Sequence, residues 1–277
     1  MADLEATIED LWARRGDLSA GNQAGEDALA VAREAIDTLD RGETRVAELA
    51  SDGSVVVHQW LKQAILLYFK LSSMATIEHG PFEYADKIPL KTGYAALGVR
   101  VVPGASARWG SYLERGVIMM PSYVNIGARV GANTMVDTWA TVGSCAQIGA
   151  NVHLSGGVGI GGVLEPPQAA PVFIGDEALI GSRCMITQGA RVGEGAVLGE
   201  GCVLNRAIPV IDAETGSEIS RGVVPPWCVG VTASRPRTFA GGTFGLPCIL
   251  IIRRLEPGQR HDSAKLNELL REEGVAT

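Results

Sequence analysis

The chain has 277 residues, and 31 acidic side chains against 24 basic ones give a formal net charge of −7. This balance argues against a surface for nucleic acid or an anionic membrane, because neutralising phosphates needs clustered Lys and Arg. Glycine is frequent, with 35 residues, and aromatic residues make up only 5%. A folded repeat with a core of small aliphatic side chains is therefore favoured over a disordered tract.

The N-terminal residues and the cysteines together indicate the cellular compartment of the protein. The chain begins MADLEATIEDLW, which is acidic where a signal peptide is basic, and no apolar run reaches 18 residues. The five cysteines are odd in number and form no CxxC motif. We expect a cytoplasmic protein with no membrane segment, no paired disulfides and no metal.

Residues 1–99 have the mixed pattern of a small α/β cap domain. The expected elements are two polar-faced helices, a hairpin and a third helix, over residues 3–15, 26–40, 46–57 and 58–73. In the third helix one apolar residue recurs at every fourth position, at Leu61, Ile65 and Phe69. This spacing predicts one buried stripe on that helix.

From about residue 100 to 208 the chain carries a six-residue repeat. An aliphatic side chain recurs at Ile118, Val124, Val130, Val136, Val142, Ile148, Leu154 and Ile160. After an interruption at 163–173 the phase resumes at Ile174, Ile180, Ile186, Val192, Leu198 and Leu204. Small residues, among them Cys184 and Cys202, follow four places after most of these positions. This is the pattern of a hexapeptide β-helix, in which aliphatic side chains fill a narrow interior and the next residue points outward.

Residues 209–277 form the last part, a small β/α segment. We expect turns around 212–216, a strand over 248–252 and a short helix over 262–273. The predicted fold class is thus mainly β: a parallel β-helix of hexapeptide repeats between an N-terminal α/β cap and this C-terminal segment.

Three runs resemble one family more closely than the repeat alone does. They are MPSYVNIGA (120–128), the long run over 134–166 that begins TMVDTWATVG, and HQWLKQAILL (58–67). They are similar to tetrahydrodipicolinate N-succinyltransferases of the lysine and diaminopimelate pathway, over nearly the whole chain. The resemblance implies a homotrimer of left-handed β-helices, with active sites in grooves between subunits. It also implies succinyl transfer from succinyl-CoA to the amine of tetrahydrodipicolinate, in its open form 2-amino-6-oxopimelate.

Asp137 is the leading candidate for a catalytic and substrate-binding residue. It stands in the outward position after Val136, where other repeats have Gly or Asn. The family aspartate in MVDTWA binds substrate and is implied to accept a proton from the attacking amine, which must be deprotonated before it attacks a thioester. The alternative is an Asp chosen for its turn-forming habit.

Arg100 and Arg183 match family arginines that hold the carboxylates of the dicarboxylate acceptor. A guanidinium suits this role because it pairs bidentately with a planar carboxylate. A surface arginine at a domain junction is the alternative for Arg100.

The chain departs from the family after Arg183. The family usually has an acid/base glutamate where this chain has Met185, and Gln188 is an amide where an acid is common. Met185 cannot transfer a proton, so either another group takes the role or the substrate is an already open amino acid. Two alternative functions stay open: an acetyl-CoA donor in a secondary-metabolite pathway, such as a tabtoxin-like β-lactam route, or a non-catalytic trimeric scaffold.

His153 is the only histidine within the repeat. Many hexapeptide acyltransferases use a histidine base, so His153 is either catalytic or a hydrogen-bonded structural residue. One histidine cannot supply a three-histidine zinc site.

The CoA thioester is expected to contact residues near the glycine-rich run 156–162 and after the last repeat. Glycine lets the pantetheine amides approach the backbone closely. The expected contacts are Ser144, Gly162, Ala178, Arg235 and Arg237, the two arginines meeting the CoA phosphates.

Overall fold

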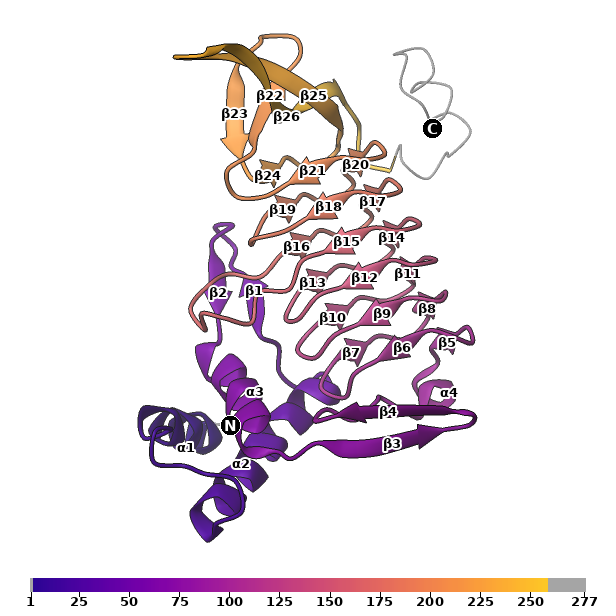
Figure 1. The fold of residues 1–277 in the computed structure, drawn as a ribbon. Coiled ribbons are helices and arrows are strands. Elements are labelled where there is room, and N and C mark those ends of the chain that lie inside the picture. The colour runs from indigo at the N-terminus through magenta and orange to yellow at the C-terminus, as the bar shows by residue number, and fades with distance from the viewer. Residues whose placement is uncertain (1, 259–277) are drawn as a thin grey trace.

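The structure is a computed structural model that describes residues 2–258. Figure 1 shows a stack of triangular coils with helices at one end and a long hairpin at the other. The expected helix over 262–273 lies outside the described residues.

The N-terminal elements lie within a few residues of their predicted bounds. They are α1 (Ala2–Ala13), α2 (Gln23–Asp40), β1 (Ala47–Leu49), β2 (Val55–Val57) and α3 (Gln59–Leu71). Helix α2 begins where the Asn22 side chain accepts a hydrogen bond from the Gly25 amide, 2.8 Å away. The hairpin of β3 (Ala75–His79) and β4 (Phe82–Asp86) was not predicted, because its mostly exposed strands carry no alternating apolar pattern. A single turn, α4 (Tyr94–Leu97), leads into the coils.

The coils are built from strands of two residues that stack into three parallel sheets. The first sheet contains β5 (Arg100–Val101), β8 (Ile118–Met119), β11 (Met135–Val136), β14 (His153–Leu154), β17 (Leu179–Ile180) and β20 (Val197–Leu198). The second contains β6 (Ser106–Ala107), β9 (Tyr123–Val124), β12 (Thr141–Val142), β15 (Gly159–Ile160), β18 (Met185–Ile186) and β21 (Val203–Leu204). The third contains β7 (Tyr112–Leu113), β10 (Arg129–Val130), β13 (Gln147–Ile148), β16 (Phe173–Ile174), β19 (Arg191–Val192) and β24 (Val223–Val224).

Each coil passes through the three sheets in turn, so the prism has three edges. Corner 1 joins the first sheet to the second, corner 2 the second to the third, and corner 3 the third to the first strand of the next coil. The second residue of each strand points into the interior and is buried, except for Val101 of β5, which is partly buried. Val136 stacks on Leu154 one coil away. The small residues also point inward, including fully buried Cys184 and Cys202. The predicted parallel β-helix is therefore confirmed.

The prediction for one position of the repeat is wrong. Ile118 was expected inside, but Met119 is the fully buried residue of β8 and pairs with Val136. Corner 1 of this coil is one residue shorter than the others, because Met120, Pro121 and Ser122 alone separate β8 from β9. The repeat phase thus slips by one residue here, which moves Ile118 to the outer face.

Helix α3 packs against corner 2 and forms a second core with α1 and α2. Ile126 and Cys145, both from corner 2, are fully buried in this core together with Ile65. The predicted stripe on α3 is buried at Leu61 and Ile65. Corner 2 is therefore a packing surface for the helices.

The C-terminal elements close the other end of the stack. They are β22 (Pro209–Asp212), β23 (Glu218–Arg221), β25 (Cys228–Phe239) and β26 (Gly242–Arg254). The expected strand over 248–252 lies within β26, and the expected turn is present where the Gly216 amide donates to the Asp212 carbonyl. Strands β24 and β25 pair with β19 and β20, so the stack continues beyond residue 208.

Candidate active site

Corner 1 stacks a column of residues that share one backbone conformation. The third corner residue has a positive φ in successive coils: 61° at Trp139, 71° at Gly157, 63° at Arg183 and 69° at Gly201. Such angles are uncommon for residues other than glycine. The column presents the Trp139 indole, which is 75% exposed, on the surface.

Asp137 opens this corner and contacts His153 of the next coil. Its Oδ2 lies 3.3 Å from His153 Nε2, and the side chains are 29% and 38% exposed. The two meet because Met135 and His153 are paired neighbours in the first sheet. The Thr138 amide donates a 2.6 Å hydrogen bond to Asp137 Oδ1, and the Thr138 hydroxyl donates to the same atom at 3.3 Å.

These contacts set the protonation of Asp137. Partial burial alone would raise its pKa, but the hydrogen bonds from Thr138 and His153 favour the carboxylate more strongly. The net result is a pKa below the usual value for Asp. Asp137 is therefore an ionised hydrogen-bond acceptor at neutral pH, partly open to solvent.

Arg183 lies on the same edge, two coils from Asp137. Its side chain packs beside Gly157 of the intervening coil, where a Cβ would stand 3.1 Å from Arg183 Cδ and 3.2 Å from Nε. Glycine at this position leaves room for the guanidinium stem to cross the corner. Arg183 is exposed and free to meet an anion beside the Asp137 corner.

Arg100 belongs to the same face but not to the same cluster. It occupies the outward position of β5, in the ladder that continues through Ile118 and Met135 to His153. Two strand spacings separate it from Met135, roughly 10 Å at about 4.8 Å per strand. An extended dicarboxylate, rather than direct side-chain contact, would have to connect Arg100 to Asp137.

Met185 and Gln188 are the two positions at which the chain departs from the pattern expected for the resembling sequences. Met185 is 44% exposed on the outer face of the second sheet and covers Gly159 of the neighbouring strand. Gln188 is exposed at corner 2, where its φ is 54°. Neither supplies a titratable group, whereas His153 does.

The expected CoA contacts do not gather at one place in this chain. Ser144 and Gly162 adjoin at corner 2, where a Cβ on Gly162 would stand 2.7 Å from the Ser144 amide nitrogen. Arg235 and Arg237 lie on the β25–β26 hairpin, where Arg235 is 3.4 Å from Glu218 and Arg237 stacks on Phe239. The prediction for Ala178 is wrong: this residue is fully buried in the prism interior and leaves no surface for a ligand.

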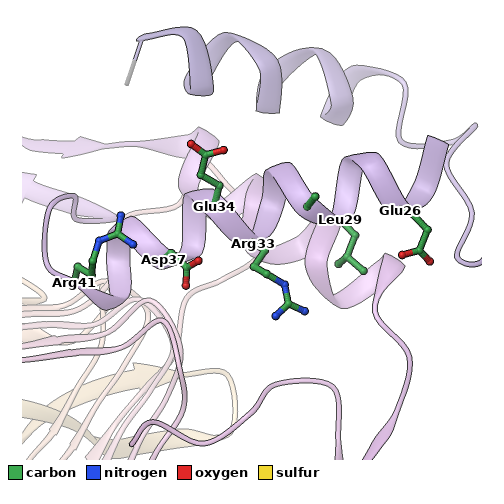
Figure 2. A pocket seen from close by; sticks show the side chains of 7 residues that line it. Glu26, Leu29, Arg33, Glu34, Asp37 and Arg41 are labelled. Carbon is green, nitrogen blue, oxygen red and sulfur yellow. The ribbon is translucent and has the colours of Figure 1, made fainter. Parts of the chain in front are cut away.

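Two hollows of about 350 and 200 Å³ lie along α2, away from corner 1. Figure 2 shows Arg33, Asp37 and Leu29 beside the larger one. None of the predicted site residues lines either hollow. We therefore place the candidate site at corner 1, where acid, imidazole and guanidinium share one edge.

Metal-ligand clusters and membrane-spanning helices are both lacking among the described residues. Within residues 2–258 no group of three His, Cys, Asp or Glu side chains is arranged to hold a metal ion. Over the same range, no helix has the length and apolar character needed to cross a bilayer. The five cysteines are buried and unpaired, and burial raises the pKa of the Cys145 thiol to about 12.

Known proteins resemble this chain over nearly all of its length. A family model described as tetrahydrodipicolinate N-succinyltransferase N-terminal matches residues 3–71, and one described as bacterial transferase hexapeptide (six repeats) matches 171–206. The 2,3,4,5-tetrahydropyridine-2,6-dicarboxylate N-succinyltransferase of Paramagnetospirillum magneticum is 47% identical, over 98% of this chain and 99% of the relative. The chain belongs to the tetrahydrodipicolinate N-succinyltransferase family. The enzyme of the same name from Acinetobacter baylyi is also 47% identical, over the same shares of both chains.

Membership in the tetrahydrodipicolinate N-succinyltransferase family confirms the resemblance found in the sequence, and the chain is accordingly an acyltransferase. Among solved structures, a candidate 2,3,4,5-tetrahydropyridine-2-carboxylate N-succinyltransferase from Campylobacter jejuni is 17% identical, with a TM-score of 0.45, and covers 81% of this chain and 62% of its own. The acetyltransferase domain of PglB from Neisseria gonorrhoeae, in complex with acetyl coenzyme A, is 21% identical with a TM-score of 0.33, over 54% and 55% of the two chains.

Thr138 is the site residue that sequence reasoning missed. Its amide and hydroxyl both donate to Asp137. The signal was present in the sequence, since an Asp at a turn commonly accepts hydrogen bonds from the residues that follow it.

Proposed function

We propose that this chain transfers a succinyl group from succinyl-CoA to the free amine of 2-amino-6-oxopimelate, the open form of tetrahydrodipicolinate, in the lysine and diaminopimelate pathway. The main structural support is the contact between Asp137 and His153 at corner 1. The chain is also 47% identical to a relative named for this transfer. The amine nitrogen attacks the thioester carbonyl carbon, an amide bond forms, the carbon–sulfur bond breaks and the CoA thiolate leaves. No enzyme nucleophile is needed.

The amine needs a base, because an ammonium must lose a proton before it attacks. Asp137 is a poor base at neutral pH: partial burial raises its pKa, but its hydrogen bonds outweigh this and hold the pKa low. An imidazole can accept a proton from an ammonium, and histidine is the side chain that most often serves as a general base. We therefore assign proton transfer to His153, and give Asp137 the task of orienting the ring and stabilising the imidazolium. One proton then passes to the leaving thiolate to give the CoA thiol, and the second proton that the nitrogen loses as the amide forms is released to solvent.

The two arginines are proposed to bind the acceptor's two carboxylates. Arg183 shares the corner 1 edge with Asp137, and Arg100 lies farther along the same face. A carboxylate at Arg183 leaves the rest of the acceptor within reach of His153. Asp137, as a fixed anion, also favours the approach of the cationic ammonium end of the substrate.

We propose a homotrimer of left-handed β-helices, with residues 1–99 as a cap. The support is the separation of the site residues, because Asp137 belongs to corner 1 while Ser144 and Gly162 belong to corner 2. One groove can hold all three only if corner 1 of one protomer faces corner 2 of its neighbour. Within such a groove Ser144 and Gly162 would contact the pantetheine arm, and Arg235 and Arg237 would meet the CoA phosphates.

We propose a cytoplasmic enzyme that uses a CoA thioester as co-substrate and binds neither nucleic acid nor a membrane. Its net charge of −7 supports the absence of nucleic-acid and membrane binding.

The donor is tested by measuring turnover with succinyl-CoA and acetyl-CoA on the same acceptor. The relatives' names favour succinyl, so we expect a higher kcat/KM with succinyl-CoA. A preference for acetyl-CoA would redirect the proposal to the secondary-metabolite alternative. Calorimetry that detects no affinity for either thioester would leave a trimeric scaffold.

The assignment of His153 is tested by substitution. His153→Gln removes the group that accepts the ammonium proton, so it should lower kcat about 100-fold, while the KM for the acceptor should stay near wild type. A variant that keeps the wild-type kcat would return the base to Asp137.

A further inference from the structure

Lys62 is a fully buried lysine on α3, next to the buried stripe. Its Nζ donates to two backbone carbonyls, Val163 O at 2.5 Å and Ala169 O at 2.6 Å. Among the described residues no carboxylate lies within ion-pair distance of this ammonium. Burial lowers the pKa of Lys62, so the charged form depends on these two carbonyl contacts.

Both carbonyls belong to one segment, the loop 163–172 that interrupts the repeat between β15 and β16. The loop leaves the prism at corner 2, directly after Gly162, and the Val163 amide donates to the Ser144 carbonyl at 3.1 Å. Leu164 packs against the helical core. Lys62 therefore joins the start of the loop to a point six residues later, and fixes both to α3.

A lysine would be an unfavourable residue for this space if its only role were packing. A buried ammonium without a carboxylate costs desolvation energy that an aliphatic side chain would avoid. The ammonium supplies two short, charge-assisted hydrogen bonds, to the carbonyls of Val163 and Ala169. The contacts thus serve the conformation of the loop.

We propose that Lys62 is a positioning residue for the transfer reaction: it holds loop 163–172 on α3, and so fixes the Gly162–Val163 wall against which the CoA thioester lies. This inference rests on the proposed function, because it takes corner 2 as the cofactor side of the groove. It adds a role for the helical domain, which sets the shape of that groove through one side chain.

The test compares Lys62→Met with Lys62→Arg in the full-length protein. For Lys62→Met we expect faster backbone hydrogen exchange in 163–170 without ligand, and a KM for succinyl-CoA raised about tenfold, as for a lost charge-assisted hydrogen bond. The kcat and the KM for the acceptor should stay near wild type. Lys62→Arg, which keeps the charge and the donors, should restore part of the loss.

Lys87→Met is the matched control, because Lys87 Nζ also donates to a carbonyl of α3, Phe69 O at 2.6 Å, but does not touch the loop. It should leave both measurements unchanged. If Lys62→Met does not fold, Leu164→Ala loosens the same loop without leaving a polar group unpaired, and should raise exchange and KM in the same direction.

Two results would overturn the proposal: unchanged exchange in 163–170 in a folded Lys62→Met protein, or faster exchange with an unchanged KM for succinyl-CoA. If the wild type itself neither binds nor turns over succinyl-CoA, the proposed function fails instead. The exchange measurement then still decides whether Lys62 holds the loop.

Discussion

Corners 1 and 2 are built from the same six-residue repeat, yet their surroundings are opposite. At both, the third residue adopts a positive φ, 61° at Trp139 and 68° at Cys145. Trp139 is 75% exposed, whereas Cys145 and Ile126 are fully buried under α3. The difference comes from what packs against each edge and not from the local backbone.

A solenoid repeat does not determine what each edge of the prism contacts. The interior is filled in the same way in every coil, so stability does not require any particular outward residue. Corner 2 packs against the helical core. Corner 1 keeps a polar cluster, with Asp137 and His153 in contact, on an open surface.

The largest expected effect is a loss of kcat on substitution at corner 1, with no such loss on substitution at corner 3. Asp137→Asn should lower kcat by about 10²–10⁴, because His153 loses the anion that orients it, while the melting temperature stays near wild type. Asp176→Asn is the matched control, since Asp176 at corner 3 also accepts a backbone amide, that of Ala150 at 2.9 Å. It should keep wild-type activity. Equal losses in the two variants would remove the functional distinction between the edges.

The next effect concerns corner 2 as a folding surface. Ile126→Ala should reduce the free energy of unfolding by about 2–5 kcal/mol, because it opens a cavity between α3 and the prism. Chemical denaturation measures this loss, and the kcat of the folded fraction should be retained. A loss below about 0.5 kcal/mol would mean that the helices do not depend on this edge.

The smallest effect is expected for the exposed indole at corner 1. Trp139→Ala should change the free energy of unfolding of the isolated protomer by less than about 0.5 kcal/mol, as for other exposed substitutions. The measurement is denaturation over a range of protein concentrations. In the proposed trimer a neighbouring subunit lies against corner 1, so the loss should grow as the protein concentration rises. A loss that stays small at every concentration would contradict this arrangement.

Several features could be predicted from the sequence because they follow from the period alone. Val136 and Leu154 point inward and stack, and residues one coil apart, such as Met135 and His153, become neighbours. The choice between Ile118 and Met119 could not be predicted, since both are apolar and adjacent. It was decided by the shortened corner at Pro121, whose length the repeat does not dictate.

The role of Lys62 was hidden for a different reason. In the sequence Lys62 lies at the edge of the apolar stripe of α3, and its residue type is almost never fully buried without a partner, so exposure was the expectation. In the structure, a loop 101 residues farther along the chain covers it. No local pattern contains a contact of that separation.

By itself, then, the sequence determined the coil, its interior and the outward position of Asp137, because these depend on strand alternation and on the volume of a narrow prism. The tertiary structure alone decided which edge the helices cover, that Ala178 is withdrawn from any ligand, and that Lys62 holds the loop beside Gly162. The physical reason is that a repeat encodes contacts between successive coils, whereas these features depend on contacts between segments that share no repeat.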